Sequence, residues 1–198
     1  EVNKNILNEI ADKLTQVVGG SADVANSTGA TLVNGGNYST ANRRGRNLHF
    51  GVREHSMGAI INGIALYEDF IPFCSTFLSF SNYMLPSIRM ASLMKINSLF
   101  LFTHDSINIG KDGPTHQPIE QLANLRSIIN LTTFRPADAN ELCAVYDYYL
   151  REGGATAVVL PRNKMEMLDG KFKEAQYGGY VLRAPEKEAD IVLYASGS

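Results

Sequence analysis

The residues with the clearest potential for chemistry lie in one glycine-punctuated segment, residues 103–118. This segment holds two of the chain's four histidines, His104 and His116, together with Asp105 and Asp112. Turn formation alone does not require so many titratable side chains. Imidazole and carboxylate groups can hydrogen-bond the carbonyl and hydroxyl groups of a polyhydroxylated substrate. A metal site is the alternative, but the spacing of the two histidines matches no compact set of zinc ligands.

A second candidate is Glu54, within the run Gly-Val-Arg-Glu-His-Ser-Met-Gly of residues 51–58. It stands where an apolar helix is predicted to begin. The simplest interpretation is a carboxylate that compensates the exposed N–H groups and the dipole at the helix start. A role in chemistry is the other interpretation, and the run alone does not decide between them.

A third candidate is the aromatic set Phe77, Phe80 and Tyr83, whose members are spaced by three. Core packing explains such a stripe without any ligand, and a ring-lined pocket is the alternative. The two interpretations are compatible, because the walls of a pocket are also part of the core.

These residues must be positioned by strands and helices that alternate along the chain. Periodicity predicts helices at residues 3–15, 53–67, 76–94, 120–126 and 139–151. Strands are predicted near residues 17–18, 48–50, 70–73, 98–103, 131–134 and 156–160. Residues 25–47 are rich in polar and glycine residues and are predicted to form a long loop.

The alternation predicts an α/β fold, a parallel β-sheet flanked by helices on both faces. Three polar loops, which start at Gly20, Phe50 and Thr103, each follow a predicted strand. Open α/β sheets bind ligands beyond the carboxyl ends of their strands, so we expect these loops to share one crevice.

Composition excludes several classes of protein. The 198 residues are 44% hydrophobic and carry a net charge of −2, with no basic run that would suggest nucleic acid or an anionic membrane. No apolar stretch is long enough to span a bilayer, and the first residues do not resemble a signal peptide. The two cysteines, Cys74 and Cys143, show no paired motif and are expected to be reduced thiols of a cytoplasmic protein.

The end of the chain predicts a domain boundary. Residues 166–188 are polar, and residues 189–198 resemble a buried strand that runs into a Gly-Ser turn. We expect one domain over residues 1–165, then a linker and the first strand of a truncated C-terminal domain over residues 166–198. A strand of this kind normally leads into a helix, so the chain is expected to be a fragment.

Five segments between about Gly19 and Arg162 resemble transketolase in order and spacing. They are residues 51–55, 76–83 (Thr-Phe-Leu with Phe80 and Tyr83), 103–107 (Thr-His-Asp-Ser-Ile), 112–118 (Asp-Gly-Pro-Thr-His-Gln-Pro) and 135–141 (Arg-Pro-Ala-Asp-Ala-Asn-Glu). The run over residues 112–118 is the most specific of them. The resemblance implies the pyrimidine-binding domain of the thiamine-diphosphate-binding fold.

The same resemblance implies thiamine diphosphate as the cofactor. Glu54 would hydrogen-bond its aminopyrimidine ring and promote loss of the proton from its reactive carbon. Phe77, Phe80 and Tyr83 would surround the pyrimidine, and Asp23 would lie near the cofactor. The cofactor itself then acts as the electron sink.

Substrate contacts are implied in the same way. His104 and His116 would bind and polarise the sugar, and Asp112 would read its hydroxyl stereochemistry. Ser27 and Arg162 would hold the phosphate, for which a guanidinium is well suited. From the residues alone, Arg162 is equally well explained as a solvated loop arginine.

Transketolases bind the diphosphate and a divalent metal, Mg²⁺ or Ca²⁺, through a Gly-Asp-Gly motif on a separate N-terminal domain, and this chain has no Gly-Asp-Gly. The resemblance implies a homodimer in the full-length protein, with this domain facing the partner's diphosphate-binding domain. The expected activity is transfer of a two-carbon ketol unit between sugar phosphates of the xylulose 5-phosphate and ribose 5-phosphate class. The isolated fragment is expected to be inactive. Alternatives are a dihydroxyacetone synthase and a non-catalytic interaction module.

Overall fold

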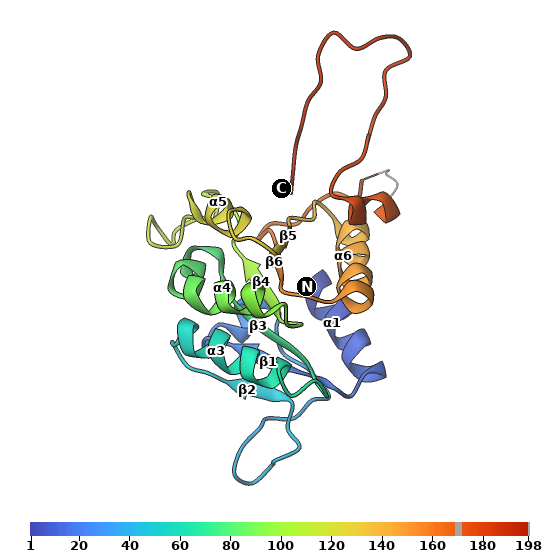
Figure 1. Ribbon diagram of the computed structural model, residues 1–198. Coiled ribbons are helices and arrows are strands. Elements are labelled where there is room, and N and C mark those ends of the chain that lie inside the picture. Colours follow the sequence, from blue (N-terminus) through green and yellow to red (C-terminus); the bar gives the residue numbers. More distant parts are fainter. Residues whose placement is uncertain (169–171, 198) are drawn as a thin grey trace.

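A single six-stranded sheet forms the centre of the protein in the computed structural model, which describes residues 1–168 and 172–197 (Figure 1). All its neighbouring strands are parallel, in the order β2-β1-β3-β4-β6-β5. The strands are β1 (Val17–Ser21), β2 (Asn47–His49), β3 (Ile71–Phe77), β4 (Leu99–Thr103), β5 (Thr132–Phe134) and β6 (Thr156–Val159). The predicted parallel α/β sheet is confirmed.

Helices cover both faces of the sheet, as predicted (Figure 1). One face packs against α1 (Val2–Lys13) and α6 (Ala139–Glu152). The opposite face packs against α3 (Glu54–Ala65), α4 (Leu85–Met94) and α5 (Gln121–Arg126). Short helical segments complete the fold: α2 (Ala25–Thr28) and the 3-10 helices η1 (Leu78–Tyr83) and η2 (Phe172–Tyr177).

Strand β4 lies in the middle of the sheet and is covered by helices on both faces. Its side chains alternate between the two cores, with Leu99 and Leu101 toward α1 and α6, and Phe100 and Phe102 toward α3, α4 and α5. All four are almost fully buried. Burying a side chain of this size contributes about 1.5–3 kcal/mol, so a continuous apolar run is required where both faces are covered.

The predicted helix over residues 76–94 is wrong at its start. Thr76 and Phe77 are the last residues of β3, where they pair with Phe102 and Thr103 of β4. The chain then forms η1, and α4 begins only at Leu85, with Pro86 in its first turn. The spacing of three between the aromatic residues is the period of a 3-10 helix, not of an α-helix.

The predicted loop over residues 25–47 is mostly irregular but contains α2. One buried side chain, Asn47, holds it together. Its amide oxygen accepts from the N–H of Leu32 at 2.8 Å, and its amide nitrogen donates to the carbonyls of Leu32 and Gly36 at 2.8 and 3.0 Å. The asparagine therefore satisfies backbone groups that no strand or helix pairs.

The C-terminal residues do not form the predicted strand within the part that the structure describes. Residues 189–197 have no regular structure, and the apolar side chains from Ile191 to Tyr194 are exposed. A strand requires a neighbouring strand to satisfy its backbone groups, and none lies beside this segment in the described residues. Residues 169–171 of the predicted linker, and Ser198, lie outside the described residues. The proposed division after residue 165 stays a prediction.

None of the helices within residues 1–168 and 172–197 combines the length and apolar character needed to cross a membrane.

Two glycines in β1 allow its neighbours to approach closely, and this generates a stability prediction. A Cβ on Gly20 would overlap the carbonyl of Leu48 on β2, whereas a Cβ on Gly63 of α3 would meet nothing. We expect Gly20→Ala to lower the free energy of unfolding by about 1–3 kcal/mol. Gly63→Ala, the control, should raise it by about 0.5–1 kcal/mol through helix propensity. Urea unfolding followed by circular dichroism measures both, and a Gly20→Ala protein as stable as the parent would contradict the packing described here.

Candidate active site

The carboxyl ends of the parallel strands bring the predicted site residues to one edge of the sheet. Five strand ends contribute, with Asp23 after β1, Glu54 after β2, Phe77 at the end of β3, His104 after β4 and Arg162 after β6. The three loops that start at Gly20, Phe50 and Thr103 therefore lie at the same edge. This is the edge where open α/β sheets bind ligands.

An aromatic–imidazole cluster forms where β3 and β4 end. The ring of Phe77 lies 3.9 Å from that of His104 and 5.8 Å from that of Phe80, measured between centroids. The His116 ring lies 5.1 Å from Phe80 in an edge-on arrangement. Tyr83 joins the cluster through Phe80 at 6.3 Å, but 66% of it is exposed. The structure thus brings together aromatic and histidine residues that are distant in sequence.

Each histidine of the cluster is oriented by the threonine that precedes it. Thr103 Oγ1 lies 2.9 Å from His104 Nδ1, and Thr115 Oγ1 lies 2.8 Å from His116 Nδ1. No residue in the described ranges hydrogen-bonds Nε2 of either ring. The two Nε2 atoms are therefore the ring nitrogens that can serve a ligand, either as donor or as acceptor.

His104 is held in a backbone conformation that few residues adopt, with φ of 63°. Left-handed backbone is uncommon at residues other than glycine, although histidine is among the residues enriched in it, and such positions are often found at functional sites. The next residue, Asp105, forms a buried ion pair with Arg135 after β5, with Nη2 and Oδ2 2.9 Å apart. The side chains of Arg135 and Asp105 are 16% and 2% exposed. This ion pair, which the sequence analysis missed, anchors the turn that carries His104.

Arg162 holds the segment from residue 104 to 118 from the other side. Its guanidinium lies 3.7 Å from the carboxylate of Asp112 and donates a hydrogen bond to the carbonyl of Ile109. The side chain of Arg162 is 47% exposed, so its charge remains accessible to a ligand. The structure therefore gives Arg162 a role in anchoring this loop, which its position in the sequence did not indicate.

Burial lowers the pKa of His104 below its ordinary value of 6.5, and the charge of Arg162 lowers it further. The imidazole of His116 acts in the same direction, while the carboxylates of Asp112 and Asp105 oppose the shift. The net effect favours the neutral ring. A neutral imidazole can donate a hydrogen bond to a substrate oxygen or accept a proton from it.

Glu54 is the first residue of α3 and is only 9% exposed. It lies on the same buried face of the helix as Met57 and Ile61. Within residues 1–168 and 172–197 its carboxyl group accepts no hydrogen bond, and no ring contact or ion pair joins it to the aromatic–imidazole cluster. Neither carboxyl oxygen is among the described side-chain atoms that are fully buried without a hydrogen bond, so the group keeps contact with solvent and is open to a ligand.

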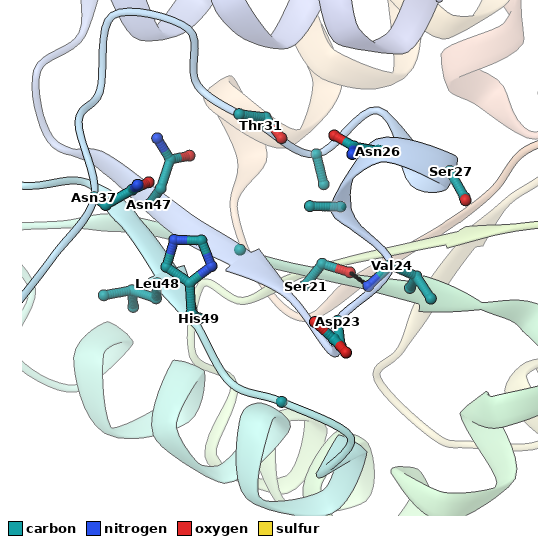
Figure 2. Close-up of a pocket in the computed structure, with 14 residues that line it drawn as sticks. Ser21, Asp23, Val24, Asn26, Ser27, Thr31, Asn37, Asn47, Leu48 and His49 are labelled. Carbon is teal, nitrogen blue, oxygen red and sulfur yellow. Dashed lines mark hydrogen bonds between the residues drawn. The ribbon is translucent and has the colours of Figure 1, made fainter.

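Two cavities flank the loop that follows β1. Asp23 and Ser27 line the first, of about 480 Å³, together with Asn37, Asn47 and His49 (Figure 2). Asp23 has the same left-handed backbone as His104, with φ of 63°, and the N–H of Val24 donates to Ser21 Oγ at 3.3 Å. His49 was not singled out in the sequence, although its place at the end of β2 is the signal that could have identified it.

The second cavity, of about 580 Å³, is lined by both Ser27 and Arg162. The structure therefore places the two residues that were predicted to hold a phosphate around one cavity. In the described part of the chain no three histidine, cysteine or acidic side chains form a group that could hold a metal ion.

A parallel sheet with polar loops gathered at its carboxyl edge defines an α/β ligand-binding domain. Residues 1–167 match the family described as transketolase, pyrimidine binding domain. The chain belongs to the transketolase family. The transketolase of Aquifex aeolicus is 44% identical over 198 residues, which cover 98% of this chain and 29% of that protein. The chain thus spans about three tenths of the length of such curated relatives.

Solved structures show the same relationship. The transketolase of Campylobacter jejuni superposes with a TM-score of 0.87 at 44% identity, covering 93% of this chain and 29% of that one. A transketolase of Pichia stipitis, in complex with sedoheptulose 7-phosphate, gives a TM-score of 0.90 at 34% identity, covering 94% of this chain and 29% of that one. The predicted family and the predicted fold are both confirmed.

The electrostatics of His104 make a titration prediction. Arg162→Gln removes a charge that disfavours the imidazolium, so the pKa of His104 should rise toward 6.5, whereas Asp112→Asn should lower it further. Lys164→Gln, which removes a nearby exposed charge that contributes no shift, is the control. Histidine C–H resonances followed by NMR against pH measure all three, and a His104 pKa unmoved by Arg162→Gln would refute the proposed cause.

The sign of the linked stability follows from the lowered pKa. As the pH falls, the unfolded chain takes up the His104 proton before the folded chain does. The stability contributed by neutral His104 is therefore complete above about 6.5 and is lost as the pH falls through the lower, folded-state pKa.

Proposed function

We propose that this chain is the pyrimidine-binding part of a transketolase, which transfers a two-carbon ketol unit between sugar phosphates. The observation that carries the proposal is the carboxyl group of Glu54, which no described residue hydrogen-bonds and which lies at the same sheet edge as the aromatic–imidazole cluster. Membership of the family supports the reaction class. The Pichia stipitis enzyme has been solved with sedoheptulose 7-phosphate and with xylulose 5-phosphate, which supports sugar phosphates as substrates.

The residues fit thiamine diphosphate, the cofactor that the family implies. Glu54 can hold a proton between its carboxyl group and a ring nitrogen of the aminopyrimidine, because it makes no competing hydrogen bond among the described residues. The rings of Phe77, Phe80 and Tyr83 provide an apolar, stacking surface for a flat heterocycle. The bound cofactor supplies the carbon nucleophile and the electron sink for the transfer. Asp23, on the loop after β1, would lie near it.

The remaining polar residues would bind the sugar phosphate. Nε2 of His104 and Nε2 of His116 would hydrogen-bond, and exchange protons with, the carbonyl and hydroxyl groups of a ketose. Asp112 would accept from a hydroxyl of defined stereochemistry. Ser27 and Arg162 share one cavity, where the guanidinium would pair with the phosphate.

The complete enzyme requires more than this chain. We propose that a diphosphate-binding domain with Mg²⁺ or Ca²⁺, on the partner subunit of a homodimer, completes the cofactor site. The chain covers only 29% of its Aquifex aeolicus relative, which leaves room for such a domain. By itself the chain would then be inactive. A place in the pentose phosphate pathway and in the cytoplasm agrees with the proposed substrates and with two free cysteines.

The similar proteins reported above are transketolases, so a dihydroxyacetone synthase is not favoured. A non-catalytic interaction module is not favoured either. Such a module would have no need of Glu54 at the sheet edge or of the buried His104 beside the Phe77 ring.

The proposed role of Glu54 is tested in the complete polypeptide that contains this chain. Glu54→Gln should lower the rate of ketol transfer from xylulose 5-phosphate by about 10²–10⁴-fold, because the amide cannot exchange the proton. Glu9→Gln, an exposed glutamate paired with Lys13 on α1, should leave the rate unchanged. A coupled spectrophotometric assay measures both. Near-normal turnover by Glu54→Gln would contradict the proposal.

A further inference from the structure

A chain of buried hydrogen bonds joins α3 to α4 and to the start of β4. Ser87 Oγ on α4 donates to the carbonyl of His55 at 2.8 Å, and it also lies 3.0 Å from His55 Nδ1. Asn62 Nδ2 donates to the carbonyl of Ser87 at 2.8 Å, and Asn62 Oδ1 accepts from Ser98 Oγ at 3.2 Å. These polar residues are almost fully buried, with exposed fractions of 5% for Asn62, 3% for Ser87 and 0% for Ser98.

The two helices approach most closely beside this chain of hydrogen bonds. A Cβ on Gly58 would lie 2.8 Å from the Cβ of Ser87 and 3.2 Å from the Cε of Met84. Real Cβ atoms do not approach so closely, so glycine is required at this position of α3. The contact lies one turn beyond Glu54. The close approach is what allows the short side chain of Ser87 to reach the backbone of the first turn of α3.

Met57 packs the first turn of α3 into the core, and Arg53 Nη1 donates to the carbonyl of Phe50 at 3.1 Å just before the helix. Its N-cap residue, Arg53, makes no side-chain capping hydrogen bond to the helix. The carboxyl group of Glu54 has no hydrogen bond to any residue within the described ranges. The position of that carboxyl group is therefore set by the backbone of the first turn, and Ser87 is the side chain that bonds this backbone from outside the helix.

We propose that Ser87 is a positioning residue for Glu54: its hydroxyl fixes the first turn of α3 so that the Glu54 carboxyl group meets the pyrimidine ring. The inference rests on the proposed function of Glu54. It adds a determinant outside the cavity, on a helix that provides no other side chain to the site. Gly58 and Asn62 contribute to the same arrangement. Gly58 permits the close approach of the two helices, and Asn62 hydrogen-bonds the carbonyl of Ser87.

The same contact generates an expectation for the tautomer of His55. A serine hydroxyl has a single proton, and Ser87 donates it to the carbonyl of His55. The contact between Ser87 Oγ and His55 Nδ1 is then a hydrogen bond only if Nδ1 carries a proton. We therefore expect Nδ1 of His55 to carry a proton when the Ser87 hydroxyl donates to the His55 carbonyl, and this proton reports on the contact between the helices.

The test compares two buried serines of α4. Ser87→Ala removes the hydroxyl that reaches α3. Ser92→Ala, the matched control, removes a hydroxyl that is equally buried but donates at 3.0 Å to the carbonyl of Ile88 in its own helix. ¹⁵N NMR of histidine-labelled chain reads the His55 tautomer, and the complete polypeptide gives the thiamine diphosphate dissociation constant, kcat and the sugar KM.

We expect Ser87→Ala to weaken cofactor binding or kcat by ~3- to 10-fold, the loss of one hydrogen bond, with the sugar KM unchanged. His55 should lose its Nδ1–H preference in Ser87→Ala and keep it in the control Ser92→Ala. Gly58→Ala keeps every polar group but pushes the helices apart, so it should reproduce both effects even if Ser87→Ala does not fold.

Equal cofactor binding and kcat in Ser87→Ala and Ser92→Ala would overturn the inference, as would a normal Gly58→Ala protein. The failure of the proposed function looks different. In that case Glu54→Gln would turn over normally, whereas a failure of the inference alone leaves Glu54→Gln impaired and Ser87→Ala normal.

Discussion

The parallel pairing of β3 with β4 is the constraint on which the site depends. In this register Phe77 lies beside Thr103, so His104, the next residue, meets the Phe77 ring at a centroid distance of 3.9 Å. A slip of one residue would exchange the two faces of β4 and move Phe100 and Phe102 out of their core. The hydrophobic alternation of a strand that is buried on both faces thus determines where an imidazole and an aromatic ring meet.

Polar contacts as well as buried apolar residues such as Ile109 and Leu32 hold the loops beyond the strands. The buried Asp105–Arg135 pair ties the turn after β4 to the segment after β5, and Arg162 ties the same loop to the segment after β6. Breaking a buried ion pair by removing one partner typically costs about 3–5 kcal/mol. A loop held by such a pair therefore keeps one position. The site therefore combines a rigid sheet edge with loops whose positions depend on a few charges.

Much of this could be predicted from the sequence. Apolar runs that alternate with segments of helical periodicity were sufficient to predict the parallel sheet, because each pattern reflects which side chains of a segment are buried. The motif around Asp112 to Pro118 was specific enough to indicate the family, which the comparison confirmed. The predicted helix from residue 76 failed because Thr76 and Phe77 are apolar enough for either element, and only pairing with β4 decides for the strand.

Contacts between distant segments could not be predicted in the same way. Arg135, Asn47 and Ser87 carry no local signal, because their roles arise from partners on other elements. Tyr83 was expected beside its two aromatic neighbours and lies 6.3 Å from Phe80, but 66% of it is exposed.

The sequence by itself indicated which residues could carry chemistry and that they follow strands, because residue type and hydrophobic period are local properties. The tertiary structure decided that the Glu54 carboxyl group has no hydrogen-bond partner among the described residues, that His104 adopts a left-handed backbone, and that Ser87 reaches the first turn of α3. The physical reason is that these features depend on strand order, register and the close approach of two helices at Gly58. Each of these is set by packing between segments that are far apart in the chain.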